Sequence, residues 1–87
     1  MEPIYLCISQ EKTGRNIRRL IKKNGYSVQG IQELMGFESP RAIYKWMAGR
    51  SLPSIESLVV LSRIFHTYID SILVTEGDAV MEDKLAA

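Results

Sequence analysis

The chain has 87 residues, of which 46% are hydrophobic and 24% are charged, and its formal net charge is +1. This length allows one small domain, and no apolar run approaches the roughly 18 residues needed to span a bilayer. We therefore expect a protein without a membrane segment. Cys7 is the single cysteine and cannot form an internal disulfide, so we expect the reducing cytoplasm as its location. Because its neighbours are apolar, we expect a small buried side chain.

The near-zero net charge conceals two halves of opposite sign. Residues 12–50 carry nine basic and two acidic side chains, whereas residues 51–87 carry two basic and six acidic ones. A molecule with one basic side suits a polyanion such as nucleic acid. Ordinary solvated helix surface would give the same totals, so charge alone does not decide between these interpretations.

Apolar residues recur with a helical period in several stretches, starting near the N-terminus. The first helix is expected over residues 13–24, with Ile17, Leu20 and Ile21 on its apolar side and basic residues over the rest. Asn24-Gly25 should end this helix, because both residue types tolerate the left-handed conformation of a helix stop.

The second helix should begin after Ser27, whose hydroxyl can accept hydrogen bonds from the free amides of a helix start. It should stop at Gly36. Its expected buried residues are Val28, Ile31, Leu34 and Met35. Gly30 lies inside it at a cost of about 1 kcal/mol relative to alanine. Close approach of a neighbouring helix or a ligand backbone would explain this glycine.

The third helix is short and sharply bounded. Ser39 is its expected cap, and Pro40 fits the first helical position, where no amide hydrogen is needed. Gly49 supplies the stop. The residues expected to point inward are Ala42, Ile43, Trp46 and Met47. The position of Trp46 on this stripe favours a core residue over a stacking platform for bases.

A fourth helix should open at Pro53-Ser54 and end at His66, a residue type that enters the left-handed region more readily than most. Its expected buried side consists of Ile55, Leu58, Val59, Leu61, Ser62 and Phe65. A fifth, shorter helix over residues 69–74 adds Ile72 and Leu73 to the core.

The two ends of the chain depart from this helical pattern. Residues 1–12 form an N-terminal arm with an extended apolar stretch from Ile4 to Ile8, and residues 75–87 form a polar tail that should be frayed. A lone strand is unstable, so the arm must pack on its own helices or pair with another chain. The predicted fold is all-α, a five-helix bundle over residues 13–74 with a short extended arm.

Only residues 36–39 separate the second helix from the third, and so short a link forces a steep crossing. The third helix then projects, with Arg41, Tyr44 and Lys45 on its outward face. Such a helix matches the DNA major groove, where arginine can bind guanine in a fork and lysine can reach guanine or phosphate. Tyr44 suits a phosphate or thymine-methyl contact, and equally suits ordinary helix surface.

The stretch YSVQGIQELMGFESPRAIYKWMAGRSLPSIESLVVLSRIFHTYIDSIL resembles the Cro/phage-repressor, or Xre-type, helix-turn-helix domain. The likeness rests on the helix stop at Gly36, the run from Ile43 to Trp46, Gly49-Arg50 and Pro53-Ser54. With the first helix it covers residues 13–74. It implies a lambda-repressor-like fold and a sequence-specific transcriptional regulator, a repressor in particular, that binds a double-stranded operator as a homodimer.

The resemblance also implies a set of DNA-binding residues. Ser27 to Gln29 would lie against the DNA backbone, and Arg50 would meet phosphate. The residues facing the bases would be Pro40, Arg41, Tyr44 and Lys45. The turn between the second and third helices is one residue longer than is usual in the family, and Gln32, Met47 and His66 replace common family residues.

A protein-interaction or antitoxin-like module is the alternative. In that case the bundle would bind a protein partner through its apolar arm, at Ile4, Tyr5, Leu6 and Ile8. An enzyme is not expected, because the sequence has no paired serine, histidine and aspartate set and no phosphate-binding glycine loop. One histidine and one cysteine cannot build a typical zinc site, so we expect neither metal nor cofactor. The basic residues of the first helix are either solvated or add phosphate contacts.

Overall fold

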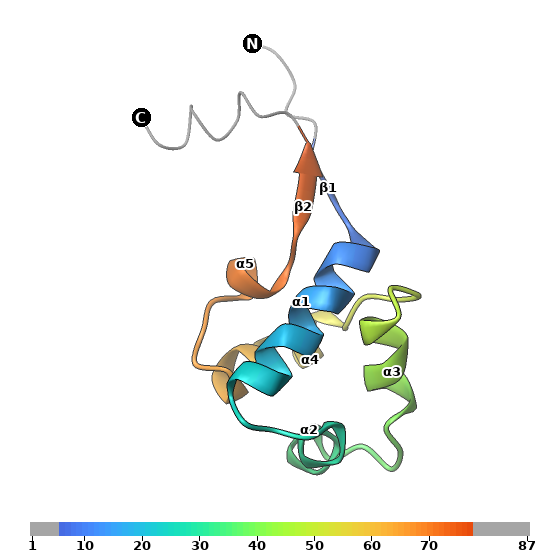
Figure 1. Ribbon diagram of the computed structural model, residues 1–87, viewed down its shortest axis with the longest axis vertical. Helices are drawn as coiled ribbons and strands as arrows, with labels where there is room; N and C mark the ends of the chain where they lie inside the picture. The colour runs from blue at the N-terminus through green and yellow to red at the C-terminus, as the bar shows by residue number, and fades with distance from the viewer. Residues whose placement is uncertain (1–5, 78–87) are drawn as a thin grey trace.

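The computed structural model describes residues 6–77 (Figure 1). Its elements are β1 (Leu6–Ile8), α1 (Gln10–Lys23), α2 (Val28–Met35), α3 (Arg41–Met47), α4 (Ile55–Ile64), α5 (Ile69–Ile72) and β2 (Thr75–Gly77). The five helices predicted from the sequence are therefore present, and two short strands extend from the bundle. No helix within residues 6–77 has the length and apolar character that a bilayer crossing needs.

All five helices contribute to one hydrophobic core. Its buried residues are Ile17, Leu20, Ile21, Ile31, Ile43, Trp46, Leu58, Leu61, Phe65 and Ile72. Full burial of each large side chain contributes about 1.5–3 kcal/mol. Trp46 is only 4% exposed, and Phe37 packs edge-on against it with ring centroids 5.9 Å apart. The prediction that Trp46 belongs to the core is confirmed.

Three apolar residues expected in the core lie at the surface instead. Leu34, Ile55 and Val59 are 55%, 79% and 40% exposed. The core-facing stripes of α2 and α4 are narrower than expected, since the buried residues within these two helices are Ile31, Leu58 and Leu61.

The predicted helix stops are confirmed. Gly36, Gly49 and His66 follow α2, α3 and α4 with φ angles of 72°, 74° and 52°. His66 is the one non-glycine residue within residues 6–77 that adopts a positive φ, as expected for a histidine in this role.

The predicted caps of α2 and α4 are also confirmed. The Ser27 hydroxyl accepts a hydrogen bond from the Gly30 amide at 3.0 Å, and the Ser54 hydroxyl accepts one from the Ser57 amide at 3.1 Å. The start of α3 differs by one residue from the prediction, because Pro40 is the N-cap. The Ser39 hydroxyl lies a long 3.5 Å from the first helical amide.

Two other helix boundaries differ from the prediction. α1 begins at Gln10, earlier than expected, because the Ser9 hydroxyl caps it by accepting from the Lys12 amide at 3.1 Å. α5 ends at Ile72, where Leu73 takes an extended conformation with φ −75° and ψ 135° and leads the chain toward β2.

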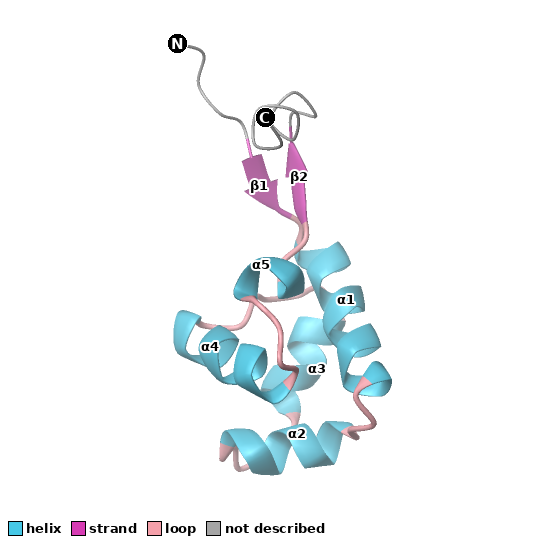
Figure 2. Ribbon diagram, turned by 90° about the vertical axis from the view of Figure 1, so that its left-hand side faces the viewer, coloured by secondary structure: helices cyan, strands magenta, loops and turns pink. Residues whose placement is uncertain are grey.

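The N-terminal arm pairs with its own chain. β1 runs antiparallel to β2, with Leu6 opposite Gly77 and Ile8 opposite Thr75, and Figure 2 shows this two-stranded ribbon leaving the bundle beyond α5 and α1. The expected frayed tail is wrong for residues 75–77, which form a strand, and β1 does not pack on the helices. Residues 4, 5 and 78–87 lie outside the described part of the chain.

Cys7 is exposed, so the prediction that it is buried is wrong. All three residues of β1 are exposed, because the ribbon stands clear of the bundle and has no core of its own. The thiol lies 3.5 Å from the carbonyl oxygen of Glu76 on β2.

α1 and α3 approach each other closely through two glycines. A Cβ on Gly14 would collide with the carbonyl oxygen of Trp46 and would come within 2.9 Å of that of Met47. A Cβ on Gly49 would lie 2.8 Å from the Cα of Glu11. The role of Gly14 was not predicted, although a glycine inside an otherwise good helix pattern is a signal of close packing. These contacts fix α3 against α1.

Candidate nucleic-acid interface

The turn between α2 and α3 is held by both backbone and side-chain hydrogen bonds. After the left-handed Gly36, the Phe37 amide donates to the Gln32 carbonyl at 3.1 Å. The Gln32 side-chain amide donates back to the Phe37 carbonyl at 3.3 Å. The Phe37 ring also packs on Trp46, which lies on the buried side of α3. The turn is therefore held both by hydrogen bonds to α2 and by a contact with the core.

α3 separates its residues cleanly between two faces. Ile43 is fully buried, and Trp46 nearly so. Arg41, Tyr44 and Lys45 are exposed on the other side, and Tyr44 is 53% exposed. Three of the four predicted base-facing residues are thus available to a ligand, while the fourth, Pro40, is half-buried.

The cations of α3 and of the loop after it have no acidic partner in the described structure. Within residues 6–77 the ion pairs join Lys12 to Glu76 and Arg15 to Glu11. Arg41, Lys45 and Arg50 are exposed and take part in neither pair. A phosphate or a base edge could therefore approach them without displacing a carboxylate.

The start of α2 lies at the surface as predicted, with Ser27 and Gln29 both exposed. Of the two explanations given for Gly30, a neighbouring helix or a ligand backbone, the first does not hold, because no neighbouring helix comes close to it. Within 4 Å, a Cβ at this position would meet only the Ser27 hydroxyl oxygen, at 3.3 Å. The surface beyond Gly30 is open to a ligand.

Arg50 begins the loop that follows α3. Its amide donates to the Lys45 carbonyl at 3.0 Å, and its side chain is exposed. Because Gly49 beside it packs on Glu11 of α1, the backbone that carries Arg50 has a fixed place relative to α3.

α1 and the start of α2 come together beside the exposed face of α3. Tyr44 lines one shallow cavity with residues of α1 and with Tyr26 and Val28 before and at the start of α2. The residues of α1 in this cavity are Arg18, Ile21 and Lys22. The predicted site set omitted Arg18, Lys22 and Tyr26. The available signal was the spacing of Arg18 and Lys22, four residues apart on one helix face.

Among the residues that the structure describes, no three His, Cys, Asp or Glu side chains are grouped so that they could hold a metal ion. The chemistry that the surface offers is hydrogen bonding and charge attraction from arginine, lysine and phenol groups.

Several known proteins share this architecture. A transcriptional regulator from Listeria innocua has 31% sequence identity to the chain and a TM-score of 0.64, over 85% of this chain and 72% of that one. The restriction-modification controller protein C.AhdI from Aeromonas hydrophila has 17% identity and a TM-score of 0.65, over 72% and 94%. The clp gene regulator ClgR from C. glutamicum has 18% identity and a TM-score of 0.65, over 83% and 88%.

A comparison with curated protein sequences gave no match. A helix-turn-helix family profile matches residues 17–72, which include the second half of α1 and the whole of α2 to α5. The chain therefore belongs to the helix-turn-helix family of the Xre/Cro type, the family of DNA-binding transcription regulators that the sequence resembled.

Proposed function

We propose that the protein regulates transcription by binding a specific double-stranded DNA operator with α3 in the major groove. The observation that carries this proposal is the exposed face of α3, where Arg41, Tyr44 and Lys45 stand opposite the buried Ile43 and Trp46. A rigid helix with one buried side and one cationic side suits the width and the charge of that groove.

The proposed contacts divide into reading and positioning contacts. Arg41 binds a guanine in a fork, Lys45 reaches a base or a phosphate, and Tyr44 contacts a phosphate or a thymine methyl. Pro40 sets the entry of α3 beside the bases. The residues that hold the DNA backbone are Ser27, Gln29 and Arg50.

Selection of bound sequences from randomised duplex DNA tests specificity directly, and a recovered consensus is expected. On that consensus, Arg41→Ala should relax the preference at a single base position by about 1–3 kcal/mol. Arg50→Ala should weaken binding equally on all sequences and lower the slope of log K against log salt by about 1. Identical behaviour of both variants across operator variants would contradict the division of roles.

The proposed active form is a homodimer that represses by occupying its operator in the cytoplasm. One α3 reads only a short half-site, and two copies with reading helices about 34 Å apart would read successive turns of the groove. The copies would meet on α4 and α5, where Val59 and Tyr68 line one cleft and Ile55 lies one turn before Val59. Tyr68 and Ile55 are 84% and 79% exposed, which supports an apolar contact there.

Solution mass measured by sedimentation tests the dimer. Ile55→Asp should convert a dimer to a monomer, whereas Leu34→Asp should not, although Leu34 is also an exposed apolar residue, on α2. Equal masses for both variants and the parent protein would contradict the proposal that the dimer contact lies on α4 and α5.

The alternative, an interaction or antitoxin-like module, is favoured by the apolar strand β1, where Leu6 and Ile8 are 46% and 41% exposed. Ile4 and Tyr5, which lie outside residues 6–77, belong to the same proposed partner segment. Replacing Leu6 and Ile8 by threonine keeps strand propensity and removes the apolar contact. This function would be supported if the parent protein bound a protein partner with an affinity that salt barely changes, and if the double variant lost that binding. DNA binding, in contrast, must weaken steeply with salt.

A further inference from the structure

An open cleft lies at the corner where α4 turns into α5. Its volume of about 810 Å³ is typical of small-molecule sites. The corner is built around His66, the residue with a left-handed backbone after α4. The Thr67 amide donates to the Ser62 carbonyl at 3.0 Å, and the Ser62 hydroxyl donates to the Val59 carbonyl at 2.6 Å. α5 and α3 lie on opposite sides of the bundle (Figure 1), so this cleft is separate from the exposed face of α3.

Two opposite charges in the cleft are not neutralised within residues 6–77. Arg63 of α4 and Asp70 of α5 both line it. Both residues are exposed, and neither takes part in an ion pair in that part of the chain. An anionic group and a cationic group of one ligand can therefore approach them without displacing an internal partner. His66 and Thr67 add further hydrogen-bonding groups to the lining.

Three other lining residues offer an apolar surface to a ligand. They are Val59, Tyr68 and Ile69. Tyr68 is 84% exposed, the highest value among the large hydrophobic residues within residues 6–77. Ile69 packs partly against the core, which fixes the position of this side of the cleft. A ligand that covers these side chains removes apolar surface from water, and this removal favours binding.

We propose that the cleft binds a free α-amino acid with a large apolar side chain, such as phenylalanine or leucine. The ligand carboxylate pairs with Arg63, whose planar guanidinium can bind both oxygens. The ligand ammonium pairs with Asp70, and the ligand side chain lies on the apolar surface. This ligand class follows from the combination of groups. A simple anion would use only Arg63, a simple cation only Asp70, and a purely apolar molecule neither charge.

The site lies on the surface proposed above for the dimer contact. A bound ligand and a second copy would therefore exclude each other at Val59 and Tyr68. This consequence rests on the proposed function, whereas ligand binding itself does not. Binding is measured in the Ile55→Asp variant, which is expected to be monomeric and which leaves every lining residue of the cleft unchanged.

NMR titration of the labelled Ile55→Asp variant with L-phenylalanine tests the site. Phenethylamine and hydrocinnamate are the control ligands, because each keeps the ring and lacks one charged group. We expect saturable shift changes at the lining residues, with a Kd of roughly 1 mM for a ligand of this size. Each control ligand should bind roughly fivefold to tenfold more weakly. Absence of saturable changes at the corner, or equal affinities of the three ligands, would overturn the proposal.

Charge variants made in the same background identify the two partners. Arg63→Gln and Asp70→Asn should each weaken phenylalanine binding roughly fivefold to tenfold. Hydrocinnamate binding should respond to Arg63→Gln alone, and phenethylamine binding to Asp70→Asn alone. The matched controls Lys23→Gln and Glu56→Gln change exposed residues outside the cleft and should have no effect. Equal losses in the control variants would overturn the assignment of the two charges, and thermal melting confirms that each variant is folded.

Sedimentation of the parent protein measures the consequence for the dimer. Saturating phenylalanine should shift its mass toward that of a monomer. A dimer that is unaffected by a ligand that binds the Ile55→Asp variant would overturn the mutual exclusion. Failure of the proposed function gives a different result, because the parent protein would then be a monomer, or would not bind DNA, before any ligand is added.

Discussion

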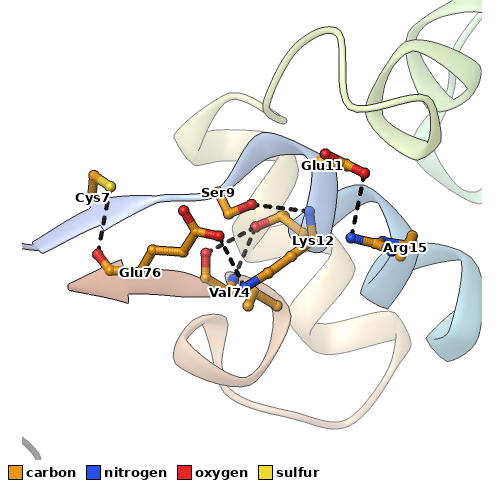
Figure 3. A network of polar contacts seen from close by, with 8 residues as sticks. Cys7, Ser9, Glu11, Lys12, Arg15, Val74 and Glu76 are labelled. Atoms are coloured by element: carbon orange, nitrogen blue, oxygen red, sulfur yellow. Dashed lines mark hydrogen bonds and ion pairs between the residues drawn. The ribbon is translucent and has the colours of Figure 1, made fainter. Parts of the chain in front are cut away.

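The two sides of α1 use the same kinds of residue for different purposes. Toward α5 and β2, polar side chains hold the fold together. The Asn16 amide donates to the carbonyls of Ser71 and Ile72 at 2.8 and 2.9 Å, and Lys12 pairs with Glu76 (Figure 3). Toward α3, Arg18 and Lys22 have no such partners within residues 6–77.

This difference in partners indicates the candidate site more specifically than the number of basic residues does. A count of basic residues treats all the cations of α1 alike, whereas their hydrogen bonds and ion pairs separate structural cations from available ones. The available ones lie beside α3, whose own cations are also without acidic partners in the described chain. Substitutions on the two sides should therefore change different properties.

The largest effect is expected at the contact that joins α1 to α3. Gly14→Ala should destabilise the protein by about 3 kcal/mol or more, because the added methyl group collides with the carbonyl oxygen of Trp46. Relaxation must move α3 away from α1, so DNA binding should fall as well. Thermal or urea unfolding measures the loss of stability. A variant as stable as the parent would show that the two helices can separate without cost.

Asn16→Ala should lower the stability of the fold and leave DNA affinity nearly unchanged. Loss of the two hydrogen bonds to the end of α5 should lower the free energy of unfolding by about 1–3 kcal/mol. Affinity for DNA, measured well below the melting temperature, should stay within a factor of about two of the parent. Arg41→Ala on α3 is the matched opposite, with stability kept within about 0.5 kcal/mol and affinity for the consensus duplex lowered by about 1–3 kcal/mol. If both variants changed both properties, the structural side of α1 and the exposed face of α3 would not be independent.

Glu76→Gln should have the smallest effect. The carboxylate and the Lys12 ammonium are each about half exposed, and exposed ion pairs of this kind contribute about 0–1 kcal/mol. Stability should drop by no more than that and should approach the parent value in high salt. A larger loss, insensitive to salt, would mean that the ribbon stabilises the bundle through other contacts.

Much of the bundle could be predicted because its signals are local. Ser27 and Ser54 cap their helices, and Gly36, Gly49 and His66 stop theirs. Each of these roles depends on the backbone preferences of one or two residues. The exposed face of α3 followed from the buried positions of Ile43 and Trp46, since helix geometry then leaves Arg41, Tyr44 and Lys45 outside.

The features that escaped prediction depend on contacts between distant parts of the chain. Nothing in Leu6 to Ile8 indicates that its partner is Thr75–Gly77, and without that pairing the exposure of Cys7 could not be foreseen. Gly14 is required only because α3 passes over it. The cavity cations could be told from the other basic residues of α1 only after Asn16, Glu76 and Tyr44 had been placed.

Backbone amide NMR of the labelled protein, titrated with the selected duplex, tests the central claim most directly. We expect the largest shift changes at the start of α2, along α3, at Arg50 and around Arg18 and Lys22, with little change in α5 and the ribbon. Changes concentrated on α5 or on Leu6 to Ile8, with α3 unaffected, would contradict the claim that the unpaired cations beside α3 bind DNA.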